Sequence, residues 1–211
     1  MTRYLLVMLS LGLLACPASD DDDSSVANDD DLANDDDTAA DDDDSPVDGK
    51  RTFMVTSTGA MGGPSGADVV CSGANTNPDP SMTWKAMLGG LTRGPCADAD
   101  CAGGTAAQLD WVFAPDTEYL RPDGGLLFTT NQNGIFTGYP MADTLLDTAT
   151  NFWTGLDSDW TVYPDFHCND WNSGGVGVQG RVGWSDGTGA SWIQSGDVGC
   201  DSLMTFLCVE Q

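Results

Sequence analysis

The chain has 211 residues and a formal net charge of −26, because 33 Asp and Glu residues outnumber 7 Lys and Arg residues. A surface this acidic repels phosphate backbones, so the composition excludes nucleic-acid binding. Residues 17–50 contribute −14 to the charge, and residues 51–211 contribute −13. Nearly all aromatic residues lie in the second part, which is long enough for one domain with a hydrophobic core.

The first fifteen residues are typical of an export signal. Arg3 supplies a positive start, and an apolar run of about ten residues extends from Leu5 to Leu14. This run is shorter than the roughly 20 residues that a membrane-spanning helix needs. The pattern therefore predicts a signal peptide over residues 1–15.

The signal ends in Leu13-Leu14-Ala15-Cys16, which resembles the lipobox of bacterial lipoprotein precursors. The resemblance implies cleavage before Cys16, acylation of this cysteine and durable membrane anchoring by several acyl chains. The alternative is an ordinary cleaved signal with an incidental cysteine. We expect a lipid-anchored protein of the bacterial cell envelope, placed in the outer membrane. Acidic residues after a lipidated cysteine also resemble surface-export signals, which favours exposure at the cell surface.

Residues 16–50 are expected to hold the lipidated cysteine and an acidic tether. From Asp20 to Asp48, blocks of Asp alternate with Ser, Ala, Asn and Thr, without aromatic residues. Such a segment cannot bury enough apolar surface to offset its ordering entropy, so it predicts disorder. A calcium site is the alternative, but the Asp blocks lack the ligand spacing and Gly turn of an EF-hand loop.

The folded domain is predicted to occupy residues 51–211. Residues 51–56 alternate and are β-branched, which predicts a strand. After a turn over 59–65, Pro64 suits the first turn of a short helix that runs to about residue 74, with Ala67, Val70 and Cys71 on one face. Residues 83–88 could form a strand or a helix.

The remainder of the domain predicts short strands joined by loops. A Gly- and Ala-rich loop is expected over 89–107, and strands are expected over 109–113, 118–121, 125–130, 152–156 and 203–209. Residues 172–199 are rich in Gly and contain Trp184 and Trp192. They predict a long ordered loop, which in a compact domain is often functional.

Six cysteines remain when Cys16 is set aside, and an even number in an exported protein predicts disulfides. Spacing alone leaves fifteen pairings open. Cys96 and Cys101 enclose a short loop and are expected to pair locally. Zinc or redox use of this loop is the alternative, but a metal would want further Cys or His ligands nearby, and the chain has the single histidine His167.

Several segments of the domain carry a family resemblance. They are Gly66-Ala67-Asp68-Val69-Val70-Cys71, Thr83-Trp84-Lys85-Ala86-Met87-Leu88, Cys168-Asn169-Asp170-Trp171, and Cys200 with Leu207-Cys208-Val209-Glu210. Together they resemble endostatin and, more closely, the leptospiral endostatin-like proteins and related bacterial domains. Phe152-Trp153-Thr154-Gly155-Leu156 is also similar to a strand of the wider C-type-lectin-like fold.

The resemblance covers residues 51–211 almost end to end. It implies a single α+β domain of the C-type-lectin-like or endostatin-like class, with short strands, one or two helices, long ordered loops and nested disulfides. It also implies the disulfides Cys71–Cys208 and Cys168–Cys200. In the chain-entropy model these two loops are worth about 5 and about 4 kcal/mol.

The sequence contains no motif that predicts catalysis, so we expect a protein that is not an enzyme. A catalytic triad would have to use His167, which lies beside the disulfide-forming Cys168. The zinc site of endostatin uses several histidines, and its heparin site uses clustered arginines. This domain has one histidine and five basic residues, so neither activity is carried over; we expect no cofactor and no heparin binding.

The tryptophans supply candidate ligand contacts. Trp153 and Trp171 are predicted to pack in the core, whereas Trp184 and Trp192 could contact a ligand from the Gly-rich loop.

Calcium is an alternative to a metal-free domain. Asp157, Asp159, Asp165 and Asp170 follow the Trp153 strand, and hard cations take oxygen ligands. The Glu-Pro-Asn or Gln-Pro-Asp loop of calcium-dependent lectins is missing, so our principal prediction is that the domain has no metal site.

We therefore expect a surface-displayed lipoprotein whose domain is a non-catalytic binding module for an extracellular protein or glycan. The leptospiral relatives are associated with host matrix and complement proteins, which supports this function by analogy alone. Calcium-assisted carbohydrate binding and a purely structural role in the envelope are the alternatives.

Overall fold

The computed structural model describes residues 48–211. The predicted signal peptide over 1–15, the lipidated Cys16 and nearly all of the predicted tether lie outside the described residues. The first strand begins at Lys50, one residue before the predicted start of the domain. Within the described part of the chain, no helix is both long enough and apolar enough to span a bilayer.

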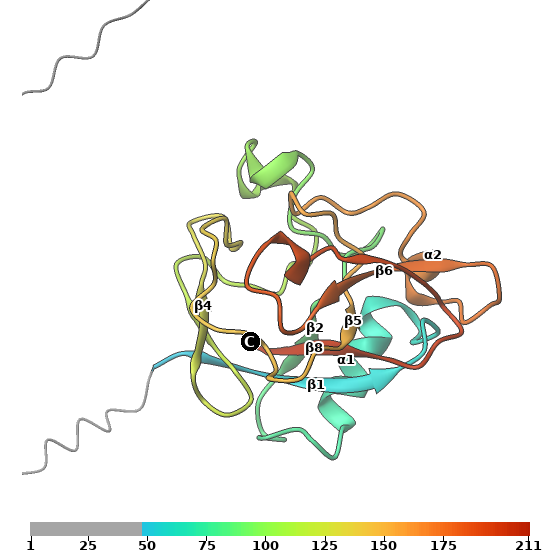
Figure 1. Ribbon diagram of the computed structural model, residues 1–211, viewed down its shortest axis with the longest axis horizontal. Coiled ribbons are helices and arrows are strands. Elements are labelled where there is room, and N and C mark those ends of the chain that lie inside the picture. The colour runs from blue at the N-terminus through green and yellow to red at the C-terminus, as the bar shows by residue number, and fades with distance from the viewer. Residues whose placement is uncertain (1–47) are drawn as a thin grey trace, which may run out of the picture. The chain divides into compact units, whose positions relative to one another are not determined.

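The domain is built on one mixed sheet whose strands follow the order β4-β3-β1-β8-β5-β6-β7, with β2 paired to β8 (Figure 1). The strands are β1 (Lys50–Ser57), β2 (Trp84–Ala86), β3 (Glu118–Leu120), β4 (Leu126–Thr129), β5 (Asn151–Trp153), β6 (Gln179–Trp184), β7 (Gly196–Gly199) and β8 (Met204–Glu210). The helices are α1 (Gly63–Gly73), α2 (Cys168–Trp171) and the 3-10 turns η1 (Ala99–Cys101), η2 (Thr105–Ala107) and η3 (Ala190–Trp192). Short strands, few helices and three disulfides define a small α+β domain, as the sequence predicted.

Strands β1 and β8 lie side by side at the centre of the sheet and run antiparallel, from Thr52 opposite Val209 to Ser57 opposite Met204 (Figure 1). Strand β5 adds to the other side of β8 in parallel. The β1–β3 pair is also parallel, and the remaining strand pairs are antiparallel. The sheet therefore joins the first and last strands of the described chain directly.

Both faces of β8 are buried. Phe206 and Cys208 point into one hydrophobic cluster, whereas Leu207 and Val209 point into another. Alternation of side chains along a strand produces this division. The uninterrupted apolar run at the end of the sequence is explained by burial on two sides.

Helix α1 packs on the cluster that contains Cys208. Gly62 before the helix has a left-handed backbone (φ 82°), and Pro64 occupies the first turn, where its missing N–H is not needed. Ala67 and Cys71 are fully buried, and Val70 is partly buried, so the predicted apolar face is the face that packs.

The predicted long loop over 172–199 is wrong, because this segment contains β6, β7 and η3. The glycines of β6 give this strand the composition of a loop. A side chain at Gly180 would collide with the Trp153 ring and the Cys168 sulfur, and one at Gly183 would collide with the carbonyl of Trp192. Glycine is required in β6 because neighbouring groups approach its backbone closely.

The predicted strand over 109–113 is also wrong. Leu109 forms one isolated bridge with Gly94, and the next residue, Asp110, has a left-handed backbone (φ 43°) that interrupts an extended chain. Val112 and Phe113 are buried, so the apolar pattern reports core packing without a strand. Residues 83–88, left open between strand and helix, contain strand β2.

Three disulfides cross-link the domain: Cys71–Cys208, Cys96–Cys101 and Cys168–Cys200. These pairs match the local pair expected from spacing and the two pairs implied by the resemblance. The first joins α1 to β8 across 137 residues of sequence, and the third closes a loop of 32 residues.

We expect the loss of Cys71–Cys208 to destabilise the domain most. In the chain-entropy model, removing it with C71A/C208A costs about 5 kcal/mol, against about 4 kcal/mol for C168A/C200A. Urea unfolding of the two double variants under identical conditions measures the difference. A larger loss in C168A/C200A would contradict this order, and a free thiol found by non-reducing peptide mapping would contradict the pairing.

Candidate functional site

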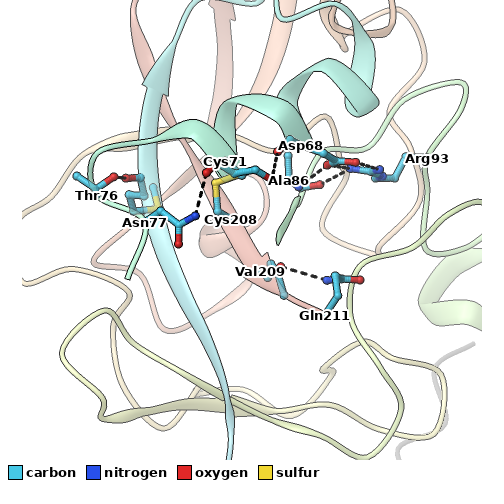
Figure 2. Close-up of a disulfide and its surroundings, with 11 residues drawn as sticks. Asp68, Cys71, Thr76, Asn77, Ala86, Arg93, Cys208, Val209 and Gln211 are labelled. Atoms are coloured by element: carbon cyan, nitrogen blue, oxygen red, sulfur yellow. Dashed lines mark hydrogen bonds and ion pairs between the residues drawn. A yellow bond between two sulfur atoms is a disulfide. The ribbon is translucent and has the colours of Figure 1, made fainter. Parts of the chain in front are cut away.

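Arg93, in the loop after β2, is fully buried against α1 and β2. The guanidinium of Arg93 donates to both carboxylate oxygens of Asp68, each at 2.7 Å, and to the carbonyl oxygen of Ala86 at 2.9 Å (Figure 2). Its Nε and one terminal nitrogen also donate to Asp110. Figure 2 shows Asp68, Ala86 and Arg93 beside the Cys71–Cys208 disulfide, so covalent and ionic links hold the same helix.

Each carboxylate of the cluster accepts hydrogen bonds from a second residue besides Arg93. Asp68 also accepts the backbone N–H of Ala86, and Asp110 also accepts from Lys85. Burial raises the pKa of Asp110, but hydrogen bonds from Lys85 and Arg93 outweigh that effect and hold its pKa below the ordinary value. The cluster is therefore charged and paired at neutral pH, and it fixes the start of the loop that contains Cys96 and Cys101.

Arg93→Met should destabilise the domain by about 3 kcal/mol, because it leaves Asp68 and Asp110 without their buried partner; the loss is at the low end for a broken buried pair, since Asp110 is 45% exposed and keeps Lys85. Arg51→Met is the matched control. Arg51 pairs with Glu210 and Asp79 while 37% of its side chain is exposed, so its loss should cost about 1 kcal/mol or less. Urea unfolding measures both variants, and equal losses would contradict a special role for Arg93.

The five basic residues of 51–211 are distributed among acidic partners. Arg51, Lys85 and Arg93 pair as described above. Arg121 contacts Asp123, Asp143 and Asp147, and Arg181 contacts Asp197 while its guanidinium stacks 3.5 Å from the ring centre of Tyr163. Each cation already faces carboxylates, which supports the expectation that the domain does not bind heparin; that expectation stays a prediction.

Helix α2 is a left-handed turn. Cys168, Asn169, Asp170 and Trp171 have φ values of 52°, 53°, 53° and 59°. This conformation costs roughly 1–2 kcal/mol for each L-residue, so successive residues adopt it where the surroundings hold them. Here the Cys168–Cys200 disulfide holds the first residue, and the indole N–H of Trp171 donates to the carbonyl of Gly89 at 2.8 Å.

The same turn fastens two neighbouring segments. The carboxylate of Asp170 accepts the backbone N–H of Leu91 at 2.8 Å and the hydroxyl of Thr92 at 3.0 Å. The backbone N–H of Met61 donates to the carbonyl of Trp171 at 2.9 Å. The turn therefore links the loop after β2 to the segment that leads into α1.

His167 precedes the turn and caps it. Its Nδ1 accepts the backbone N–H of Asp170 at 2.8 Å, and the residue is 6% exposed. Its neighbour Cys168 is disulfide-bonded. The geometry gives His167 a positioning role in the backbone of the turn.

The four aspartates that a calcium site would use contact different parts of the domain. Asp157 accepts the backbone N–H of Ser158, and Asp159 accepts the backbone N–H and hydroxyl of Thr161. Asp165 is exposed, whereas Asp170 binds the 91–92 backbone. Among residues 48–211, no group of three or more His, Cys, Asp or Glu side chains is placed to hold a metal ion.

The tryptophan candidates separate into buried and exposed residues. Trp153 and Trp171 are fully buried, which confirms the prediction for both. Trp192 is also fully buried against Phe128, Phe136 and Phe152, so its prediction as a ligand contact is wrong. Trp184 is 37% exposed at the end of β6 and is the tryptophan that keeps its candidacy.

The segment after β6 is fastened to a second loop by Ser185. The backbone carbonyl of this fully buried residue accepts from Leu145 and Leu146, and its hydroxyl donates to Thr148 and accepts from the N–H of Thr150. On the other side, Arg121 pairs with Asp143 and Asp147 of the same loop. The loop over 137–150 is therefore held at several points, although it contains no helix or strand.

Two exposed aromatic residues lie on this pair of loops, which we name the Trp184 surface: residues 137–150 and 184–191. Tyr139 is 37% exposed, as is Trp184. Partial burial, with the charge of Asp100, raises the pKa of Tyr139 to about 12, so the phenol stays neutral at physiological pH. In the sequence, Tyr139 could have been singled out as a candidate contact residue because it precedes Pro140 between two apolar segments.

Fold and loops together define a disulfide-bonded α+β domain whose sheet supports long loops held by hydrogen bonds and ion pairs. The chain belongs to the DUF1554 family, described as a protein of unknown function, whose family model matches residues 54–188. The match runs from β1 to the segment after β6, and it therefore includes the left-handed turn and Trp184. Comparison with curated proteins finds no match.

Proposed function

We propose that the domain is a non-catalytic binding module for an extracellular protein or glycan, displayed by an exported lipoprotein. The observation that carries the proposal is the Trp184 surface, where two exposed aromatic residues lie on loops held by buried Ser185 and by Arg121. Tryptophan and tyrosine supply large contact areas with polar tips, which suits both protein interfaces and sugar stacking.

The fastening of the loops supports binding because a pre-ordered surface loses less conformational entropy when a partner docks. Loop 137–150 has several hydrogen bonds to Ser185 on one side and two ion pairs to Arg121 on the other. The hydrogen bond from the backbone N–H of Thr144, with Arg121 nearby, lowers the pKa of Asp143, so this carboxylate is charged at neutral and mildly acidic pH. The two loops of the Trp184 surface thus carry both exposed aromatic side chains and negative charge.

We further propose that the DUF1554 domain is of the endostatin-like, C-type-lectin-like class. Two features support this assignment. The Cys71–Cys208 disulfide joins the first helix to the last strand, and the Phe152-Trp153 segment forms β5 between β8 and β6. The assignment concerns fold, and the ligand is argued from the Trp184 surface alone.

Trp184→Ala should weaken binding of the partner at least about ten-fold, because truncation of an aromatic hot-spot residue costs about 2 kcal/mol or more. A glycan array and pull-down from extracellular proteins identify the partner, and titration then measures the variant. Leu203→Ala is the matched control, since Leu203 is 70% exposed outside this surface. Undiminished binding by W184A, or equal losses in both variants, would contradict the proposed site, and loss of binding with chelator would favour the calcium alternative.

Cys16→Ser should release the protein from membranes, because acylation of this cysteine is the proposed anchor. Membrane fractionation with mass analysis of the N-terminal peptide tests this expectation. Cys96→Ser provides a control that also removes one cysteine, and it should remain with the membrane. A C16S protein that still fractionates with membrane, with no acyl mass on wild-type Cys16, would contradict the lipid anchor.

A further inference from the structure

His167 is the single histidine of the chain and lies 6% exposed at the start of the left-handed turn over 168–171. The backbone N–H of Asp170 donates to its Nδ1 at 2.8 Å. A neutral imidazole has one acceptor nitrogen, whereas an imidazolium has none and donates from both nitrogens. The observed hydrogen bond therefore requires the neutral ring.

From this geometry we infer that His167 is an acid-sensitive switch: its neutral ring holds the left-handed turn closed, and its protonation releases the turn. In the imidazolium, Nδ1–H faces the N–H of Asp170, so two donors oppose each other. The stabilisation from this bond belongs to the neutral ring, so it is present at higher pH and is lost when the imidazole takes up a proton.

The charged groups around His167 are already committed to other partners. On its own segment, Asp165 is exposed and the Asp170 carboxylate binds the backbone of Leu91. Asp201, next to the Cys200 that bonds to Cys168, is also exposed. The charged residues on the other elements that meet the turn form two ion pairs, Arg181 with Asp197 on β6 and β7, and Asp68 with Arg93 on α1 and the loop after β2. Tyr163 lies under the Arg181 guanidinium. These contacts leave the Asp170 N–H as the polar partner of Nδ1.

Opening of the turn frees one short segment of the domain. The Asp170 carboxylate leaves the backbone of Leu91 and the hydroxyl of Thr92, and both residues are exposed. The next residue, Arg93, is fixed by its own buried cluster, so the opening ends there. The switch therefore acts on a short surface segment that carries Leu91, a side chain already 67% exposed.

Amide hydrogen exchange of the full chain, wild type against His167→Asn, tests the inference. Asn is chosen because its side-chain oxygen accepts a capping hydrogen bond but does not titrate in this range. Between about pH 7.5 and about pH 5.5, the protection factors of the Leu91 and Asp170 amides should fall roughly ten-fold in the wild type and less than about two-fold in H167N. The Phe206 amide in β8 is the internal control and should keep its protection in both proteins.

Two results would overturn the inference: an equal fall of protection in H167N, or complete titration of the His167 ring protons by NMR while the wild-type amides stay protected. If H167N does not fold, the wild type decides alone. The midpoint of the protection loss must then coincide with the midpoint of the His167 ring titration, because the chain contains no other histidine. Separate midpoints would overturn the switch.

Discussion

The disulfide between Cys71 and Cys208 joins helix α1 to the strand that occupies the middle of the sheet. Strand β8 pairs with β1 on one side and β5 on the other, and its side chains enter both hydrophobic clusters. Each later feature builds on this arrangement. The Arg93 cluster fixes the helix beside the disulfide, and the left-handed turn reaches the segment that leads into the same helix.

The domain has few basic side chains and many carboxylates, and each of the five basic side chains of residues 51–211 contacts at least one carboxylate. Arg93 and Arg181 lie inside the domain, where Arg93 links the loop after β2 to α1 and Arg181 pairs with Asp197 across the neighbouring strands β6 and β7. Arg121 does the same for a loop near the surface, with three aspartates around one guanidinium. The structural use of these side chains leaves the outer surface with a strong excess of negative charge. Partners of this domain are therefore expected to be neutral or basic where they meet it.

Much of the scaffold could be predicted from the sequence, because alternation around Phe53, the helix face of Ala67 and Cys71, and the apolar run ending at Val209 report burial directly. The disulfide pairs needed the resemblance, since spacing left alternatives open. Strand β6 could not be predicted, because Gly180 and Gly183 imitate loop composition while they admit neighbouring rings and carbonyls. The burial of Trp192 and the divergence of the four aspartates depend on tertiary packing, which residue order does not encode locally.

The position of Cys71 also limits how the domain responds to mechanical tension. The chain enters the sheet at Lys50, and the first covalent cross-link lies at Cys71. A pull on the N-terminal side, opposed by a partner held on the loops, can peel β1 and part of α1 away. It then meets the bond to Cys208, so the extension stops after about 20 residues, or ~70 Å of straightened chain. A domain built this way would yield a short, fixed length under shear, and α1 would stay cross-linked to β8 and to the strands β5, β6 and β7 behind that stop.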